Sequence, residues 1–419
     1  MEETKLALEK AYNYPLFQAL AHRRSRRFRL GCEIEDGPFR YKSDKESVSL
    51  SKTETALLCF AAAGQTGLIV AGDNPFRLGG DCQPTWDGRT FPSVCNTQRT
   101  ALLFTNDEGV YLYKPRKSKK AAEIETLDDL ANRLQDFDKD VIKIKDGRLE
   151  IPHSPPALFR SNIHDVNYPG QTMFLPVVDI SYEEINAFLA AIRFEGYYYT
   201  DPDTGKPAGM EKWIDKLKLS VKVPLQLLEQ KLLVSCSLSA AFMIQNLLLM
   251  AEAMGLGGMP FGGFNPLVIM GGTPICRGLG FHWITTKKGE LNPIGIDGVF
   301  KSYCPPYWEN MSSAVDALVS EKYGPGGTYT PEADRTPLLD QELAAKRAEK
   351  VPEEVIQCTK DLCTYIYETY GRFPGTVDTM SIPISACIHH LDLDYYKKYY
   401  VPGLINGTHE RHMADWHEI

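Results

Sequence analysis

The stretch that most constrains this chain runs from residue 240 to residue 264 and reads AAFMIQNLLLMAEAMGLGGMPFGGF. Its first half is apolar on nearly every side of a helix, and Gln245, Asn246 and Glu252 are its clearly polar positions. A helix of this kind is buried in a core or in a subunit interface. Gly255 predicts the end of the helix, because glycine adopts the left-handed conformation that is common at helix C-termini.

A glycine-rich segment follows this helix, with Gly257, Gly258, Gly262 and Gly263 in short succession. A backbone with so few side chains can approach a flat ligand and present N–H groups to it. Two interpretations remain open at this point. The stretch is either a buried helix followed by a mobile loop, or a helix that leads into a ligand-binding turn.

The composition is that of an ordinary globular chain. Its 419 residues are enough for one large domain with an appendage, or for two domains. The formal net charge of −8 argues against non-specific nucleic-acid binding. No uncharged apolar run reaches the roughly 18 residues of a membrane span, so we expect no membrane insertion.

The expected location is the cytoplasm. The N-terminus, MEETKLALEKAYNYPLF, is charged and lacks the apolar region of a secretory signal. The ten cysteines include no Cys-x-x-Cys pair, which suits a reducing compartment better than a disulfide framework or a cysteine zinc site.

A dense basic run, HRRSRRFR, spans residues 22–29. Arginine side chains match phosphate oxygens in pairs, and a serine hydroxyl adds a further donor, so the run is a candidate anion site. The alternative is a solvated basic patch or a nucleic-acid contact, and the acidic remainder of the chain weakens the nucleic-acid version.

A second candidate group lies in FPSVCNTQRTALLF, residues 91–104. Ser93, Asn96 and Gln98 directly precede a predicted strand, 101–105, which we expect to form a hairpin with residues 110–113. Amides both donate and accept hydrogen bonds, which suits contact with the edge of a heteroaromatic ring. Alternatively, these side chains satisfy the backbone of a turn.

The remaining pattern predicts a mixture of helices and strands. Two capping boxes, Ser51-x-x-Glu54 and Ser181-x-x-Glu184, predict helix starts. Further helices are expected at 3–22, 311–322, 336–350 and 353–370, strands at 172–180 and 267–270, and a hairpin at 279–286 with 291–296. We expect a main domain over residues 1–300 with a surface excursion at 114–165, a helix and linker at 301–350, and a helical, aromatic and histidine-rich cap at 351–419.

Taken in order, these motifs resemble those of flavin-dependent nitroreductases. RRSRRF at 23–28 is similar to the family's Arg-Arg-Ser-x-Arg-x-Phe opening, and PSVCNTQ at 92–98 to its Ser-x-x-Asn-x-Gln turn. GLGGMPFGGF at 255–264 is similar to its Gly-Leu-Gly turn and Pro-x-x-Gly-Phe loop. The longer insertions further resemble the subgroup that contains azoline oxidases of thiazole/oxazole peptide biosynthesis. The resemblance covers about residues 15–300 and leaves the C-terminal part unassigned.

The resemblance implies an α+β fold, with a central antiparallel sheet flanked by helices, and a homodimer that binds FMN at its interface. By position, the family's phosphate and ribityl contacts fall on Arg23, Arg24, Ser25 and Arg27. Its isoalloxazine or ribityl contacts fall on Ser93, Asn96 and Gln98. The N–H groups of Gly262 and Gly263 would face flavin N5 and O4, and Arg277 is a further phosphate candidate.

Two departures from the family pattern stand out. Many nitroreductases have Glu just before the second glycine of the loop, where this chain has Gly262, and their Lys-x-Arg pair near the end of the fold has no clean counterpart here. Azoline oxidases are associated with a Lys-Tyr pair. Lys322–Tyr323 is the one such pair outside the tail, and it falls at the end of a predicted helix. The sequence names no proton donor.

The C-terminal region carries five of the nine histidines. His409-x-x-His412 on one helix turn, completed by His389 or His390, forms a candidate metal site. The alternative, which the composition of the tail favours, is a docked terminal cap in which histidines and tyrosines form hydrogen bonds.

These observations predict an FMN-dependent oxidoreductase that transfers hydride through flavin N5 in a ping-pong cycle with a small organic or biosynthetic substrate. The direction stays open between reduction with NAD(P)H and oxidation with oxygen as acceptor. Two alternatives remain: a metal-dependent enzyme that uses the C-terminal histidines, and a catalytically inactive flavin-binding partner subunit.

Overall fold

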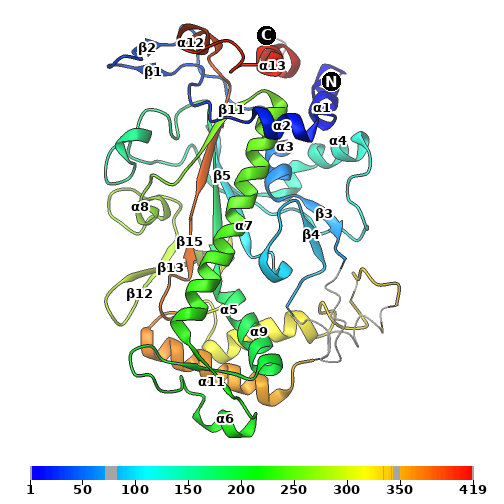
Figure 1. The fold of residues 1–419 in the computed structure, drawn as a ribbon, viewed down its shortest axis with the longest axis vertical. Helices are drawn as coiled ribbons and strands as arrows, with labels where there is room; N and C mark the ends of the chain where they lie inside the picture. Colours follow the sequence, from blue (N-terminus) through cyan, green and yellow to red (C-terminus); the bar gives the residue numbers. More distant parts are fainter. Residues whose placement is uncertain (1, 71–82, 334, 341, 343–349, 418–419) are drawn as a thin grey trace.

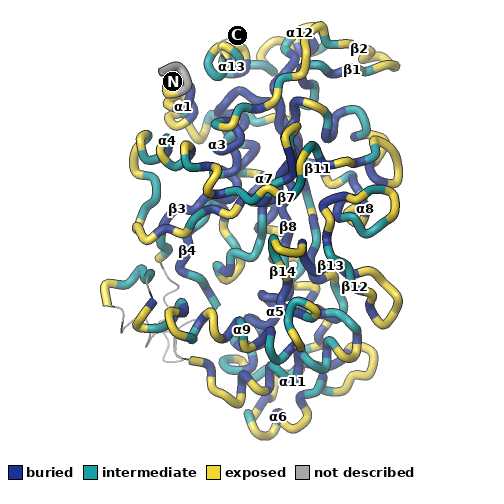
Figure 2. The backbone as a smooth tube through the Cα atoms, turned by 180° about the vertical axis from the view of Figure 1, so that it is seen from behind, coloured by how far each residue is buried: buried dark blue, intermediate teal, exposed yellow. Residues whose placement is uncertain are grey.

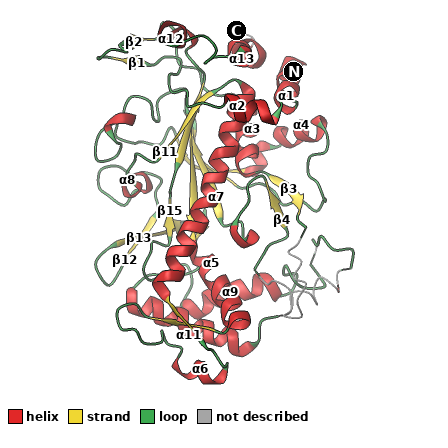
Figure 3. Ribbon diagram, viewed as in Figure 1, coloured by secondary structure: helices red, strands yellow, loops and turns green. Residues whose placement is uncertain are grey.

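The computed structural model describes residues 2–70, 83–333, 335–340, 342 and 350–417. A central sheet runs along the long axis of the molecule, and the long helix α7 (Leu225–Met254) lies against it (Figures 1 and 3). All strand pairs of this sheet are antiparallel. Its order is β11 (Gly257–Phe261), β16 (Ser385–His389), β8 (Thr172–Asp179), β5 (Thr100–Thr105), β6 (Gly109–Tyr113) and β7 (Val141–Asp146), with β15 (Met380–Ser381) also paired to β8.

The other strands form small sheets around the central one. They are β1 (Glu33–Ile34) with β2 (Tyr41–Lys42), β3 (Gln65–Leu68) with β4 (Asp87–Arg89), β9 (Tyr197–Thr200) with β10 (Val221–Pro224), and β12 (His282–Thr285) with β13 (Leu291–Ile296) and β14 (Phe300–Lys301). The β9–β10 pair is parallel and the others are antiparallel.

Helices cover the sheet and extend beyond both of its ends. They are α1 (Glu2–Tyr12), α2 (Leu16–His22), α3 (Lys52–Ala63), α4 (Leu127–Gln135), α5 (Ile180–Ala190), α6 (Glu211–Lys216), α8 (Pro266–Met270), α9 (Met311–Tyr323), α11 (Glu353–Tyr370), α12 (Leu393–Tyr399) and α13 (Gly407–His417). Short helical turns occur at η1 (Val94–Asn96), η2 (Phe137–Asp140), η3 (Arg160–Asn162) and η4 (Ala191–Glu195).

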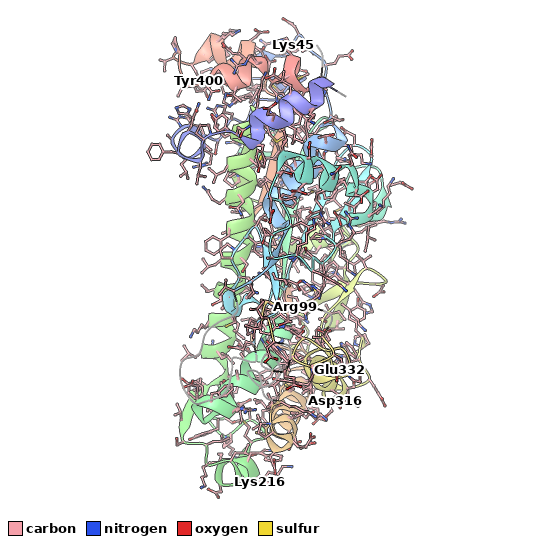
Figure 4. The ribbon with its side chains drawn as sticks, turned by 90° about the vertical axis from the view of Figure 1, so that its right-hand side faces the viewer. Lys45, Arg99, Lys216, Asp316, Glu332 and Tyr400 are labelled. Atoms are coloured by element: carbon pink, nitrogen blue, oxygen red, sulfur yellow. The ribbon has the colours of Figure 1, made fainter. Side chains whose placement is uncertain are left out.

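The molecule is elongated, with different helices at its two ends. Figure 4 places Lys45 and Tyr400 at one end, Arg99 near the middle and Lys216 at the other end. Helices α12, α13 and α1 lie at the first end, and α6 and α11 at the second (Figure 1). The central strands are buried along their length (Figure 2). Burial on both faces explains why β8 is an almost continuous apolar run rather than an alternating one.

Several predicted elements are confirmed. Ser51 caps α3 and Glu54 completes the capping box. β5 and β6 form the expected hairpin, as do β12 and β13. Helix α7 ends at Gly255, whose φ of 85° is left-handed, and α11 ends in the same way at Gly371.

Three local predictions were wrong. Residues 267–270 form helix α8 instead of a strand, because the Asn265 side chain accepts a hydrogen bond from the Leu267 N–H and Pro266 suits the first helical position. The cap of α5 is Asp179, so Ser181 lies inside the helix. The helix expected at 3–22 divides into α1 and α2, with Pro15 at the start of the second.

The C-terminal region supplies both helices and sheet strands. Helices α11, α12 and α13 agree with the helical extension that we expected. Strand β16 lies between β11 and β8, so residues from beyond the expected boundary at 300 complete the centre of the sheet. The 114–165 excursion supplies the edge strand β7. Part of the helix expected at 336–350 lies outside the described residues.

Helix α7 packs against α3, β8 and β11. It is also the one described helix that is long and apolar enough to cross a membrane, a criterion of length and composition that a core helix also meets. About two fifths of its most apolar window (39%) is buried, so one side of the helix is covered by the protein and another is not.

Candidate functional site

The basic run lies beside the first residues of β11, where the Arg26 N–H donates to the Gly258 carbonyl at 3.1 Å. Two of its arginines are already paired. The Arg26 Nη1 lies 2.6 Å from Glu252 Oε2, and both side chains are buried. Arg27 binds the Asp165 carboxylate through Nε and donates to the Ser161 carbonyl at 2.6 Å. These two arginines therefore hold segments of the protein together.

Arg29 is also buried, and its Nη1 donates to the His164 carbonyl at 3.3 Å, so the arginines that remain for an anion are Arg23 and Arg24. Arg24 Nη1 donates to the carbonyls of Ala21 and His22, at 3.1 and 2.9 Å, and so caps the end of its own helix. Among the described residues, the side chains of Arg23 and Ser25 have no hydrogen-bond or ion-pair partner.

The turn that contains Ser93, Asn96 and Gln98 has an unusual backbone, because Cys95, Asn96 and Gln98 have φ values of 50°, 48° and 57°. Non-glycine residues in this region are strained, and the surrounding contacts must hold them. Asn96 Nδ2 donates to the Thr85 carbonyl at 2.8 Å, and Gln98 Nε2 donates to Asn96 Oδ1 at 2.6 Å. The amides thus satisfy the turn, as the alternative interpretation expected.

One polar atom of this turn is left over. Gln98 Oε1 is buried and has no hydrogen-bond partner among the described residues. The backbone N–H of Gln98 donates to Ser93 Oγ at 3.1 Å, so the Ser93 hydroxyl is also engaged in the turn.

Gly262 and Gly263 directly follow β11, and Gly262 lines a groove. The groove has a volume of about 780 Å³, and Gly262, Phe264 and Leu238 are among the residues that line it. A Cβ atom on Gly262 would meet nothing closer than the Pro383 carbonyl at 3.9 Å. Within the part of the chain that the structure describes, neither glycine N–H donates a hydrogen bond.

The opposite side of this loop is held firmly. Phe159 N–H and Asn162 Nδ2 both donate to the Gly263 carbonyl, at 2.9 and 3.4 Å. A second hollow of about 670 Å³ lies here, and Phe264 and Pro266 line both hollows. The loop therefore presents its glycine N–H groups from a fixed backbone.

The three predicted groups do not form one cluster in a single chain. Arg26 in the arginine run pairs with Gly258 at the start of β11. Gly262 lies four residues farther along the chain, which corresponds to about 13 Å in an extended strand. The 93–98 turn is at the same end of the sheet as Gly262. Strands β16 and β8 separate β5 from β11, which is about 14 Å across the sheet.

Arg277 lies in the loop that follows α8. Its side chain is exposed and has no hydrogen-bond or ion-pair partner among the described residues. It is therefore free to bind an anion, but the structure gives no contact between it and the other predicted residues.

A buried titratable group that the sequence did not identify is Glu183 in α5, which is not among the residues that line the groove beside Gly262. Its side chain is buried, and burial raises the pKa of its carboxyl to about 7, while a hydrogen bond from Thr97 acts in the opposite direction. A carboxyl with a pKa near neutrality can both give and take a proton. The sequence gives no direct sign of this group, because Glu183 lies inside the Ser181-x-x-Glu184 segment, which indicates only the start of a helix.

The candidate metal ligands of the tail separate into different environments. His412 lies in a cluster with Glu54, His390 and His417. His389 Nδ1 instead lies 3.3 Å from Gln171 Nε2 in the core. His409 Nδ1 lies 2.8 Å from Asn406 Oδ1.

Comparisons with known proteins give one weak structural similarity. No protein-family model matches the chain, and no curated protein matches it. Among solved structures, the chain is similar to a candidate nitroreductase from Ralstonia eutropha JMP134, at 16% identity and a TM-score of 0.26, over 60% of this chain and 71% of that one. A TM-score of this size supports no conclusion about function.

Proposed function

We propose that this protein is an FMN-dependent oxidoreductase that acts on a small organic substrate, with the flavin ring in the groove beside Gly262. The observation that carries the proposal is a pair of N–H groups, at Gly262 and Gly263, that donate no hydrogen bond within the described residues. Gly262 lines a groove of about 780 Å³, and the Gly263 carbonyl accepts hydrogen bonds from Phe159 and Asn162.

The backbone at Gly262 suits the isoalloxazine ring of FMN. Gly262 has no side chain and open space beside it, so a planar ring can approach its backbone. An N–H donor near flavin N5 stabilises the charge that develops there on reduction. When bound, FMN supplies the hydride chemistry, and the protein supplies orientation and electrostatics.

Fewer arginines are available to bind the FMN phosphate than the sequence motif predicted. Since Arg26 and Arg27 are paired with carboxylates, we assign the phosphate to Arg23 and Arg24, with Ser25 as an additional donor. We keep Arg277 as a further candidate, because its guanidinium is exposed.

A second copy of the chain is part of the proposal. Leu227, Val234, Leu238 and Phe242 form an exposed apolar stripe along α7, at 61%, 60%, 48% and 41% exposure. Val234 and Leu238 also line the groove, so a partner on this face would close the groove and exclude water from it.

The proposal includes two directions of reaction: reduction of the substrate with electrons from NAD(P)H, or its oxidation with oxygen as acceptor. NAD(P)H or oxygen is the proposed second substrate. We place the protein in the cytoplasm, in line with the nine free cysteines among the described residues.

The test is a titration with FMN of the wild-type protein and of two variants that place side chains of increasing size at Gly262. Gly262→Ala should bind FMN slightly less tightly, and Gly262→Leu at least tenfold less tightly, because the added side chain fills the groove. Both variants should melt at the wild-type temperature, since a Cβ at this position meets no close neighbour. Equal FMN affinity across the series would contradict the proposal.

An inactive flavin-binding subunit is separated from an enzyme by a second measurement. Anaerobic addition of NAD(P)H, or of a reducing substrate, should bleach the bound flavin of an enzyme. Flavin that binds but is never reduced would favour the non-enzymatic alternative.

A further inference from the structure

A cluster of four metal-ligating side chains lies outside the proposed flavin groove. Glu54 comes from the first turn of α3, His390 directly follows β16, and His412 and His417 come from α13. One ligand atom from each lies within 4.8 Å of the others. The cluster is at the end of the sheet where His389 pairs with Gly257, whereas Gly262 lies beyond the opposite end of β11.

The closest distances in the cluster resemble those of a metal site. His390 Nδ1 lies 2.9 Å from His412 Nε2. Glu54 Oε1 lies 3.1 Å from His412 Nε2, and Glu54 Oε2 lies 3.0 Å from His417 Nε2. A tetrahedral zinc ion with bonds of 2.0–2.1 Å separates its ligand atoms by about 3.3 Å, so small movements would complete the geometry.

The outer hydrogen bonds of the histidines fix which ring nitrogens face the centre. His412 Nδ1 lies 2.7 Å from the Met254 carbonyl, which can only accept, so this nitrogen carries the proton. His390 Nε2 lies 3.4 Å from the Ser49 carbonyl, so this nitrogen carries the proton of the His390 ring. In the neutral form of each ring the inward nitrogen then bears a lone pair, which is the arrangement that protein ligands of metals adopt.

Between these two imidazoles, lone pairs therefore converge without a donor. His390 Nδ1 and His412 Nε2 face each other, and the neighbouring Glu54 Oε1 has no hydrogen-bond partner among the described residues. The Glu54 carboxylate is fully buried; its Oε2 accepts from the Ser51 N–H at 2.6 Å in the capping box, and its described ion pairs are with histidines alone. A buried carboxylate is costly unless a positive charge lies beside it.

We propose that Glu54, His390, His412 and His417 bind a divalent transition metal, most readily Zn²⁺. Three imidazole nitrogens and one carboxylate oxygen are zinc ligands, whereas Mg²⁺ and Ca²⁺ prefer oxygen alone. Four protein ligands fill a tetrahedral shell, so the site is structural. The metal joins α13 to α3 and fastens the C-terminal residues to the N-terminal half of the protein.

The experiment uses the full-length protein, stripped with a chelator and then titrated with Zn²⁺ alone. Bound metal is measured by mass spectrometry after gel filtration, and the melting temperature is recorded with and without Zn²⁺. Glu54→Gln, His412→Ala and His417→Ala remove one ligand each, and His164→Ala, a partly exposed histidine outside the cluster, is the matched control.

The wild type and His164→Ala should retain about one zinc ion per chain and melt about 5 °C or more higher with the metal. The three ligand variants should lose at least tenfold in zinc affinity and show no such shift. If His412→Ala fails to fold, Glu54→Gln, which keeps the shape of the side chain, decides the question.

Two results would overturn the site. One is a wild-type protein that retains no zinc and melts at the same temperature with and without Zn²⁺, as expected if a proton on His412 Nε2 satisfies the cluster instead. The other is zinc retention by Glu54→Gln and His412→Ala that equals that of the wild type. Replacement of Zn²⁺ by Co²⁺ adds a check, because coordination by these ligands would give visible d–d absorption that the ligand variants lack.

Discussion

Arg26 and Glu252 form a buried ion pair, with Arg26 Nη1 and Glu252 Oε2 2.6 Å apart. The pair joins the basic N-terminal segment to the last turns of α7. Arg26 also donates to the Leu404 carbonyl at 2.9 Å, and Asn406 Nδ2 donates to Glu252 Oε1 at 3.1 Å. One charged pair thus connects the N-terminal segment, the central helix and the C-terminal loop.

Removal of one partner should therefore be costly. We expect Arg26→Met to lower the free energy of unfolding by about 3–5 kcal/mol, because it leaves the Glu252 carboxylate buried without its cation. The double variant Arg26→Met/Glu252→Leu should recover much of this loss. Urea unfolding of the wild type, both single variants and the double variant measures the coupling. A loss below about 1 kcal/mol in the single variant would show that the pair is not buried in solution.

The end of α7 should be intolerant of a side chain. Gly255 has a φ of 85°, and a Cβ on it would lie 2.5 Å from the Thr408 carbonyl oxygen. We expect Gly255→Ala to destabilise the protein by more than about 1 kcal/mol, through backbone strain and displacement of α13. Gly262→Ala is the matched control and should be close to neutral, because Gly262 has neither constraint. Equal unfolding midpoints for the two variants would argue against this packing of α13.

Glu183 should make stability depend on pH. Burial raises the pKa of its carboxyl to about 7 in the folded protein, from the ordinary value of 4.5. The folded state thus favours the protonated form, so the stabilisation is fully present below about pH 4.5 and is lost as the pH rises through 7.

Glu183→Gln should therefore raise the free energy of unfolding at about pH 8 by up to about 3 kcal/mol and change it little at about pH 5. Urea unfolding at both pH values tests this, with exposed Glu354→Gln as the control. An equal effect of Glu183→Gln at both values would show that the carboxyl does not titrate in this range.

The exposed stripe of α7 should mediate self-association. Val234→Lys and Leu238→Lys each place a charge in the apolar face and should convert a dimer to a monomer in sedimentation velocity runs. Val401→Lys changes an apolar residue elsewhere that is still more exposed and should leave the dimer intact. A wild-type protein that sediments as a monomer at all concentrations would contradict the proposed interface.

Local signals in the sequence located many of the elements correctly. Side-chain caps and helix-ending glycines depend on a few neighbouring residues, which is why α3, the end of α7 and α11 were predictable. The errors occurred where two local signals competed. The apolar run at 267–270 resembles a strand, but the cap at Asn265 and the proline that follows it favour a helix.

Long-range relationships could not be predicted in the same way. The position of β16 between β11 and β8 depends on pairing across more than a hundred residues, and no short motif encodes it. The sequence showed Glu54 only as half of a capping box. Its contacts with His412 and His417 arise because α13 folds back onto α3.

The predicted flavin residues illustrate the same limit. Each motif was located from neighbouring residues, but the ion pairs of Arg26 and Arg27 join them to residues far away in the chain. The number of arginines in the motif therefore overstated the charge that is available to a phosphate.

The most direct test of the proposed function is the visible absorption spectrum of the purified full-length protein, followed by chromatography of the chromophore released by heat. The proposal predicts the two bands of an oxidised flavin and about one FMN per chain in the extract. A colourless protein that also fails to bind added FMN would contradict it.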